Sequence, residues 1–169
     1  MERTSARLAD GPTAGVRTWI DAVPERVWPV VSDIALLPAA STELQSVEWL
    51  DGATGAVLGA RFHGHNRNDA LGDWTTTSHV VECAPGRAFG WAVADPDDPI
   101  ATWRFALSPR DGGTDLHYEV RLGTRSSGLT TAIERRPESE ESIVRQRLQG
   151  LERNMTATLD HLKRLAEGR

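Results

Sequence analysis

Apolar residues follow two different periods along this chain. Between residues 137 and 165 they recur every three or four positions, the spacing that places side chains on one side of an α-helix. The stripe consists of Val144, Leu148, Leu151, Met155, Leu159 and Leu162. The preceding part of the chain shows short alternating segments instead, which is typical of strands. The pattern therefore predicts one long amphipathic helix, Pro137 to Leu165, whose apolar side covers one face of a sheet.

Seven strand segments and two short helices are predicted before that helix. The first strand is expected at Gly15 to Ala22, and a short helix then begins around Pro24, because proline suits a first helical turn. A second short helical piece is expected to end at Pro38. Six further strands are bounded by turn residues: Gln45–Leu50, Val57–Asn66, Trp74–Cys83, Ala88–Ala94, Thr102–Ser108 and Asp115–Leu122. Connections this short favour antiparallel neighbours.

The order of these elements indicates an α+β protein with one curved antiparallel sheet. A chain of 169 residues suits a single domain, which we expect over residues 13–169, after a flexible lead-in over residues 1–12. The net charge of −5 argues against nucleic acid as a partner. Arg145 and Arg147 follow a run of acidic residues, which is typical of a solvated helix face.

The chain offers little for a disulfide, a thiolate metal cluster or a membrane anchor. Its one cysteine, Cys83, lies at a predicted strand end and is expected to be a small buried residue. There is no apolar run of membrane-spanning length and no apolar leader segment at the start, so we expect a cytoplasmic location.

Residues of a strand alternate between the two faces of a sheet, so each predicted strand divides into an inner and an outer set. The inner sets are Phe62, Gly64 and Asn66; Trp74, Thr76, Ser78 and Val80; Phe89, Trp91 and Val93; Trp103, Phe105 and Leu107; and Leu116, Tyr118, Val120 and Leu122. This inner surface is rich in aromatic residues but also carries Asn66, Thr76, Ser78 and the Tyr118 hydroxyl. Buried polar groups need hydrogen-bond partners, so the mixture favours a ligand cavity. The alternative is that the aromatic residues are simply core.

Several segments resemble the START-like (SRPBCC) superfamily, and within it the polyketide cyclase/dehydrase-like proteins, over about residues 14–167. The segments that carry the resemblance are Val23–Asp33, Gly59–Arg67, Pro85–Trp91, Thr102–Pro109 with Gly112–Thr114, and Asn154–Leu159 with Leu162 and Lys163. The resemblance implies a helix-grip fold, in which the sheet wraps around the C-terminal helix and leaves a cavity between them. It does not fix the reaction, because this superfamily contains enzymes, carriers and sensors.

Together, the inner sets, the helix stripe and the resemblance define the candidate ligand-binding residues. They are Phe62, Asn66, Trp74, Thr76, Ser78, Phe89, Trp91, Trp103, Phe105, Tyr118, Leu151, Asn154, Met155 and Thr158. Tyr118 and Asn66 are the candidates for a catalytic role. No Asp, Glu or His is predicted to face inward as a general base, which weakens the case for an enzyme.

Other chemistry finds no support in the sequence. His63 and His65 share one face of a predicted strand, but two ligands are too few for a zinc site and their face is the outer one. His79, His117 and Glu119 are also assigned outward. No phosphate-binding loop, dinucleotide fingerprint or nucleophile elbow occurs, and no metal or cofactor is expected.

The main hypothesis is therefore a protein that binds a hydrophobic, partly polar small molecule such as a polyketide, an aromatic or a lipid-like compound. Catalysis of its cyclisation or dehydration is a second hypothesis. A non-catalytic ligand carrier, or a stress-response or partner-binding module, is the alternative, and a homodimer is left open.

Overall fold

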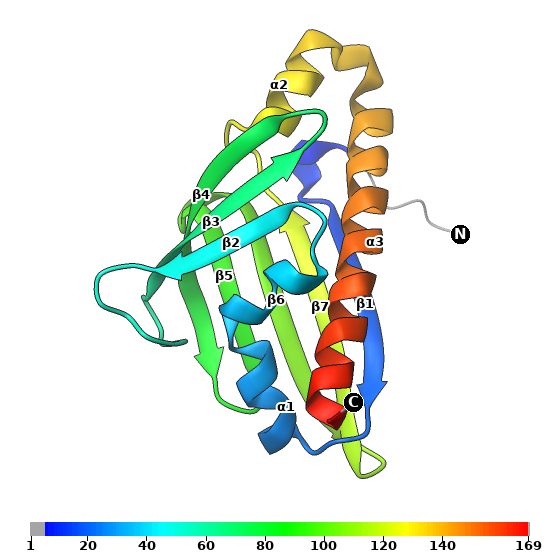
Figure 1. The fold of residues 1–169 in the computed structure, drawn as a ribbon. Helices are drawn as coiled ribbons and strands as arrows, with labels where there is room; N and C mark the ends of the chain where they lie inside the picture. Colours follow the sequence, from blue (N-terminus) through cyan, green and yellow to red (C-terminus); the bar gives the residue numbers. More distant parts are fainter. Residues whose placement is uncertain (1–5, 169) are drawn as a thin grey trace.

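The computed structural model describes residues 6–168 and consists of one curved antiparallel sheet with a long helix across its inner side (Figure 1). The strands are β1 (Thr13–Ile20), β2 (Leu44–Trp49), β3 (Arg61–Asn68), β4 (Gly72–Ala84), β5 (Ala88–Asp95), β6 (Asp98–Arg110) and β7 (Gly113–Leu122). They lie in the order β1-β7-β6-β5-β4-β3-β2. The predicted helix-grip architecture with seven antiparallel strands is thus confirmed.

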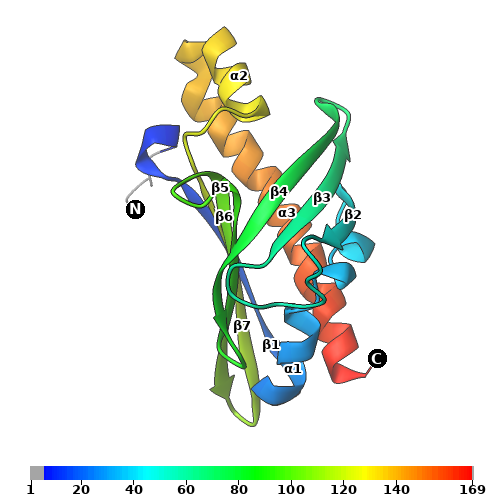
Figure 2. The same cartoon turned by 90° about the vertical axis from the view of Figure 1, so that its left-hand side faces the viewer.

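The helices lie at the two ends of the sheet and across it (Figure 2). They are α1 (Pro24–Val31), α2 (Gly128–Arg135) and α3 (Glu140–Glu167), with the 3₁₀ turns η1 (Leu8–Asp10), η2 (Ile34–Leu36), η3 (Pro38–Ala40) and η4 (Pro137–Ser139). Pro38 begins η3 rather than ending a helical piece, in keeping with the preference of proline for a first turn. Pro29 lies inside α1, beyond its first turn.

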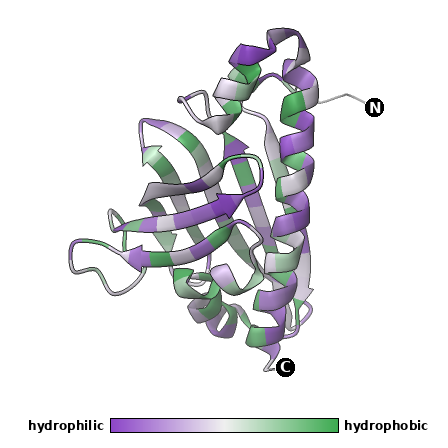
Figure 3. Cartoon of the chain, turned by 45° about the horizontal axis from the view of Figure 1, so that its top comes forward, coloured by the Kyte–Doolittle hydropathy of each residue, from purple (hydrophilic) through white to green (hydrophobic). Residues whose placement is uncertain are grey.

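The long helix buries the predicted stripe. Val144, Leu151, Met155, Leu159 and Leu162 are all buried, and Leu148 packs at the edge of the same cluster. Hydrophilic residues cover much of the outer side of α3 (Figure 3). The helix packs along β1 and against α1, so that its C-terminal half closes the core at one end of the sheet.

Several boundaries differ from the prediction, and two of the differences have identifiable reasons. The strand expected from Val57 begins only at Arg61, because the Ala60 N–H donates to the Val57 carbonyl at 3.1 Å and Gly59 has a φ of +84°. Val57 and Leu58 therefore lie in an exposed loop. In residues 6–12 the structure departs from a flexible lead-in, since Leu8 is buried and its N–H donates to Glu140 Oε1 at 3.0 Å. Residues 1–5 of that prediction lie outside the described part of the chain.

The division of the strands into faces agrees with the burial of their side chains. On β7, Leu116, Tyr118, Val120 and Leu122 are buried, and on β6 Phe105 is buried while Arg104 is exposed. On β4 and β3 the inner residues Ser78 and Phe62 are buried as well. This face looks toward α3, and the site described next lies on it.

Candidate functional site

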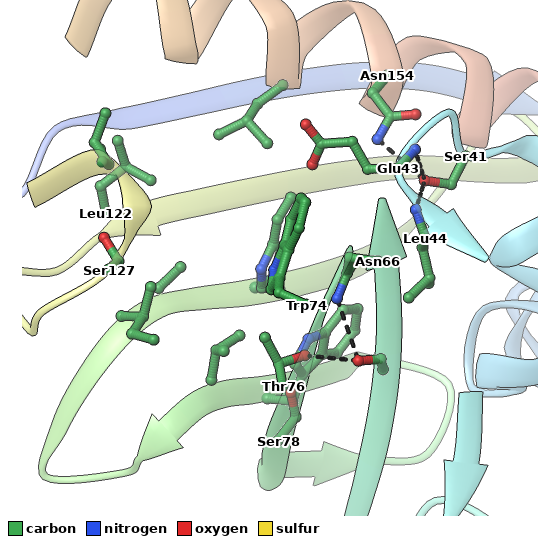
Figure 4. Close-up of a pocket in the computed structure, with 18 of the residues that line it drawn as sticks. Ser41, Glu43, Leu44, Asn66, Trp74, Thr76, Ser78, Leu122, Ser127 and Asn154 are labelled. Atoms are coloured by element: carbon green, nitrogen blue, oxygen red, sulfur yellow. Dashed lines mark hydrogen bonds between the residues drawn. The ribbon is translucent and has the colours of Figure 1, made fainter. Parts of the chain in front are cut away.

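A cavity of about 210 Å³ lies between the inner face of the sheet and α3 (Figure 4). Its floor comes from β3 to β7, one wall from α3, and a second wall from the segment that joins η3 to β2. The tip of the β3–β4 hairpin and the start of α2 meet at one end. Residues from β2 to β7, α2 and α3 therefore contribute to one cavity.

The floor of the cavity is mainly aromatic. The rings of Trp91 and Trp103 are stacked, with centroids 6.3 Å apart and planes inclined by 14°. Trp103 in turn lies 5.5 Å from the ring of Tyr118, and Phe62 meets Trp91 edge-on at 5.9 Å. Such a surface offers broad, rigid apolar contact to a ligand.

Most of the predicted residues meet at this cavity. Eleven of the fourteen line it: Phe62, Asn66, Trp74, Thr76, Ser78, Trp91, Trp103, Tyr118, Leu151, Asn154 and Thr158. Phe89, Phe105 and Met155 do not, because they are at most 1 % exposed within the core. Strand parity identifies the inner face but not how far along that face the packed core extends. The role of the eleven residues in binding stays a prediction.

Tyr118 is the most distinctive polar group of the floor. Its side chain is 5 % exposed, and its ring is stacked on Phe105 with centroids 4.1 Å apart. Its hydroxyl makes no hydrogen bond to any of residues 6–168. Burial raises the pKa of the Tyr118 phenol far above its usual range. The hydroxyl is therefore a neutral donor that faces the cavity.

Three further polar side chains lie on the neighbouring strands β3 and β4. The Asn66 amide donates to the Gly64 carbonyl at 3.2 Å, and the Thr76 hydroxyl reaches the same carbonyl at 3.5 Å. The Ser78 hydroxyl, on a residue 2 % exposed, has no hydrogen-bond partner in the described chain and stays open to the cavity. A Cβ at Gly64 would lie only 3.1 Å from Thr76 Oγ1, so glycine leaves room for this cluster.

Sequence analysis missed the charged part of the cavity. Arg147 of α3 makes a bidentate ion pair with Glu43, from Nη1 to Oε1 at 2.5 Å and from Nη2 to Oε2 at 3.1 Å. Both residues line the cavity, and their side chains are 31 % and 20 % exposed. The expectation that Arg147 belongs to a solvated helix face is therefore wrong, as is the expectation that no carboxylate faces inward.

Only one of these two residues could have been found from the sequence. Arg147 comes three positions after Val144 and four before Leu151, so it shares the apolar side of the helix. Glu43 precedes β2 in a segment without periodicity, and only the tertiary fold brings it to α3.

The segment that carries Glu43 is tied to α3 by a second set of hydrogen bonds. The Thr42 N–H donates to Asn154 Oδ1 at 3.0 Å, and Asn154 Nδ2 donates to Ser41 Oγ at 3.3 Å. Ser41 Oγ also accepts from the Leu44 N–H at 2.9 Å. Asn154, predicted as a ligand-binding residue, is thus engaged in holding the cavity wall in place.

At one end of the cavity the tip of the β3–β4 hairpin contacts the start of α2. Leu71, at the tip of the β3–β4 hairpin, lies so close to α2 that a Cβ at Gly128 would be 2.7 Å from its Cδ2 atom. A capping box of Ser127 and Thr130 fixes the start of α2. Because Leu71 is 49 % exposed, this contact is the outermost part of the wall.

Groups that could have supported other chemistry lie elsewhere. His63 and His65 are on the outer face of β3, where both approach Glu48 Oε1, at 3.4 and 3.7 Å. Within residues 6–168 no group of three or more His, Cys, Asp or Glu side chains could hold a metal ion. Burial raises the pKa of the Cys83 thiol, which reaches the Ala56 carbonyl at 3.5 Å. No helix in that range is long and apolar enough to cross a membrane.

A curled antiparallel sheet closed over a cavity by a long C-terminal helix defines a helix-grip protein of the START-like (SRPBCC) class. The sequence model of the family described as polyketide cyclase / dehydrase and lipid transport matches residues 14–167, and the chain belongs to this family. No curated protein matches the chain.

Solved structures with the same fold are numerous. The Polyketide_cyc-like protein Cgl2372 from Corynebacterium glutamicum is 26 % identical, with a TM-score of 0.64, over 92 % of this chain and 91 % of that one. The di-domain ARO/CYC protein StfQ from the steffimycin biosynthetic pathway is 15 % identical, with a TM-score of 0.71, over 93 % of this chain and 51 % of its own. BexL, the di-domain ARO/CYC protein of the BE-7585A pathway, is 20 % identical, with a TM-score of 0.68, over 94 % and 50 %. The chain therefore spans about half the length of the two di-domain proteins.

Proposed function

We propose that this protein binds a hydrophobic, partly polar small molecule, such as a polyketide, an aromatic or a lipid-like compound, in the cavity under α3. The observation that carries the proposal is an aromatic floor on which the hydroxyl groups of Tyr118 and Ser78 have no hydrogen-bond partner among residues 6–168 and stay open to the cavity. Buried polar groups in a packed core are almost always hydrogen-bonded. Their position on a cavity wall suits a ligand that carries oxygen or nitrogen atoms.

The size of the cavity limits the part of the ligand that it encloses. A cavity of about 150 Å³ lined by apolar side chains holds benzene, and this one measures about 210 Å³. We therefore expect it to enclose a group about as large as two fused rings. A longer molecule would have to displace Leu71 from Gly128 in order to extend past them.

A matched pair of variants on β6 tests this proposal. Ala101 lines the cavity, whereas Ala106 lies on the outer face of the same strand. Isothermal titration calorimetry with naphthalene-2-carboxamide should show saturable binding to the wild-type protein and to Ala106→Phe. Ala101→Phe should abolish it by placing a ring in the cavity. Equal binding by both variants would show that the ligand site lies elsewhere.

Conversion of the bound molecule is a second candidate function, favoured by the presence of a carboxylate and a neutral phenol in one cavity. Glu43, paired with Arg147, is the candidate base, and the Tyr118 hydroxyl is a donor to a carbonyl oxygen on which charge develops. Ring closure followed by loss of water, the second hypothesis from the sequence, needs these two roles.

Heptane-2,6-dione is a suitable probe of that reaction, because an intramolecular aldol step with loss of water converts it to 3-methylcyclohex-2-enone. A catalyst should accelerate formation of the enone, and both Glu43→Gln and Tyr118→Phe should remove the acceleration. If the wild-type protein formed the enone no faster than Ala101→Phe does, the protein would be a non-catalytic carrier, which is the alternative function for the same cavity. A stress-response or partner-binding role would instead require an exposed apolar surface.

A further inference from the structure

The charges in the cavity wall are balanced. Among the residues of the described chain that line the cavity, only Glu43 and Arg147 carry a full charge, and they are paired with each other. We infer that the ligand is electrically neutral at the end that meets α3, where it presents a carbonyl, amide or hydroxyl group. This inference rests on the proposed binding function and narrows the class of ligand.

The geometry of the pair explains why it offers hydrogen bonds but no net charge. Arg147 uses one N–H on each terminal nitrogen for the two carboxylate oxygens. A guanidinium has five N–H groups, so three remain. Glu43 Oε1 also accepts from Asn68 Nδ2 at 3.3 Å. A ligand oxygen can therefore accept a hydrogen bond from Arg147 without disturbing the pair.

A ligand with a carboxylate at this end would bind less favourably than a neutral one. To gain the full attraction of Arg147 it would have to displace Glu43, which would then keep its charge in a wall where its side chain is only 20 % exposed. Leaving one partner of such a pair without its counter-charge is strongly unfavourable. If Glu43 stayed in place, the ligand would lie beside a charge of the same sign.

Two ligands of the same shape test this inference, namely naphthalene-2-carboxamide and naphthalene-2-carboxylate at neutral pH. Calorimetric titration of the wild-type protein should give at least tenfold tighter binding of the amide. Glu43→Gln releases Arg147, so the carboxylate should bind at least tenfold more tightly than it does to the wild type.

Glu48→Gln is the matched control, because it makes the same change in charge on β2 at a side chain that is 61 % exposed on the outer face. It should leave the ratio of the two affinities unchanged. Circular dichroism before each titration confirms that the variants are folded, and the wild-type comparison does not depend on any variant.

The outcomes separate this inference from the proposed function. Equal or tighter binding of the carboxylate to the wild type, or the same ratio for Glu43→Gln and Glu48→Gln, would overturn the neutral-ligand inference and leave the binding function intact. If neither naphthalene compound binds the wild type, the proposed function fails for this cavity and the inference fails with it.

Discussion

Replacement of Tyr118 by phenylalanine tests whether the tyrosine hydroxyl contributes to ligand binding or to the stability of the fold. The Tyr118 hydroxyl faces the cavity without a partner among the described residues, so its removal breaks no protein hydrogen bond. A fully buried donor that lacks a partner costs the fold about 1–3 kcal/mol, but the Tyr118 hydroxyl stays open to the cavity, where water reduces that cost. We therefore expect the free energy of unfolding of Tyr118→Phe to equal that of the wild type or to exceed it by up to about 1 kcal/mol.

The same substitution should weaken ligand binding. One net hydrogen bond contributes about 0.5–1.5 kcal/mol, which corresponds to a loss of affinity of roughly twofold to thirteenfold. Urea denaturation measures the first quantity, and calorimetric titration with naphthalene-2-carboxamide measures the second. Affinity should fall while the free energy of unfolding does not, a combination that a purely structural tyrosine would not produce.

Thr158→Val is the matched control, since it also removes a hydroxyl from the cavity wall. The Thr158 hydroxyl donates to the Asn154 carbonyl at 3.1 Å, so it is already satisfied within α3. Its removal should leave affinity within about twofold, since no ligand bond is lost. If Tyr118→Phe instead lowered the free energy of unfolding by more than about 1 kcal/mol, the hydroxyl would have a structural partner and the reasoning would be refuted.

Three further measurements follow from the same structure. Phe105→Ala, in the core, should lower the free energy of unfolding by about 3–5 kcal/mol. Trp74→Ala, on the cavity wall, should lower it by less than half as much and should mainly reduce affinity for the ligand. Equal losses in urea titrations would contradict the assignment of Phe105 to the core and Trp74 to the wall. Tyr118 is the only tyrosine of the chain, so a phenolate difference spectrum measured against neutral pH has no contribution from another tyrosine. The phenolate signal should stay absent from the folded protein above pH ~10, while the free energy of unfolding falls with rising pH by up to about 1.4 kcal/mol per unit, because only the unfolded state releases the proton. Gly128→Ala should displace Leu71 and speed ligand dissociation in stopped-flow measurements, and an unchanged rate would show that ligands leave by another route.

The parts of this fold that the sequence predicts best are those with an unbroken period. The apolar stripe of α3 and the alternation on β6 and β7 fix which side chains face inward, and Trp103 and Tyr118 lie where the alternation placed them. The family resemblance then indicates a cavity between these two surfaces. The apolar stripe of the single long helix must be buried against the apolar face of the seven-stranded sheet, so few other arrangements of helix and sheet are possible.

The missing parts of the site depend on tertiary contacts between segments without a period. Glu43 belongs to a connection before β2, and Leu71 to a hairpin turn that meets α2. The residues around Glu43 and Leu71 have no hydrophobic period that would indicate which way either side chain points. Phe89 and Phe105 illustrate the converse error, because they lie on the correct face but at a place where the core is closed.

The most direct test of the central claim is an NMR measurement of nuclear Overhauser effects between bound naphthalene-2-carboxamide and the protein. Since the chain has one tyrosine, cross-peaks to its ring identify the floor of the cavity without ambiguity. We predict cross-peaks from the ligand to the rings of Tyr118 and Trp103 and to the side chain of Leu151, which together enclose the cavity. Cross-peaks confined to exposed side chains such as Val57 and Leu58 would contradict a ligand site between the sheet and α3.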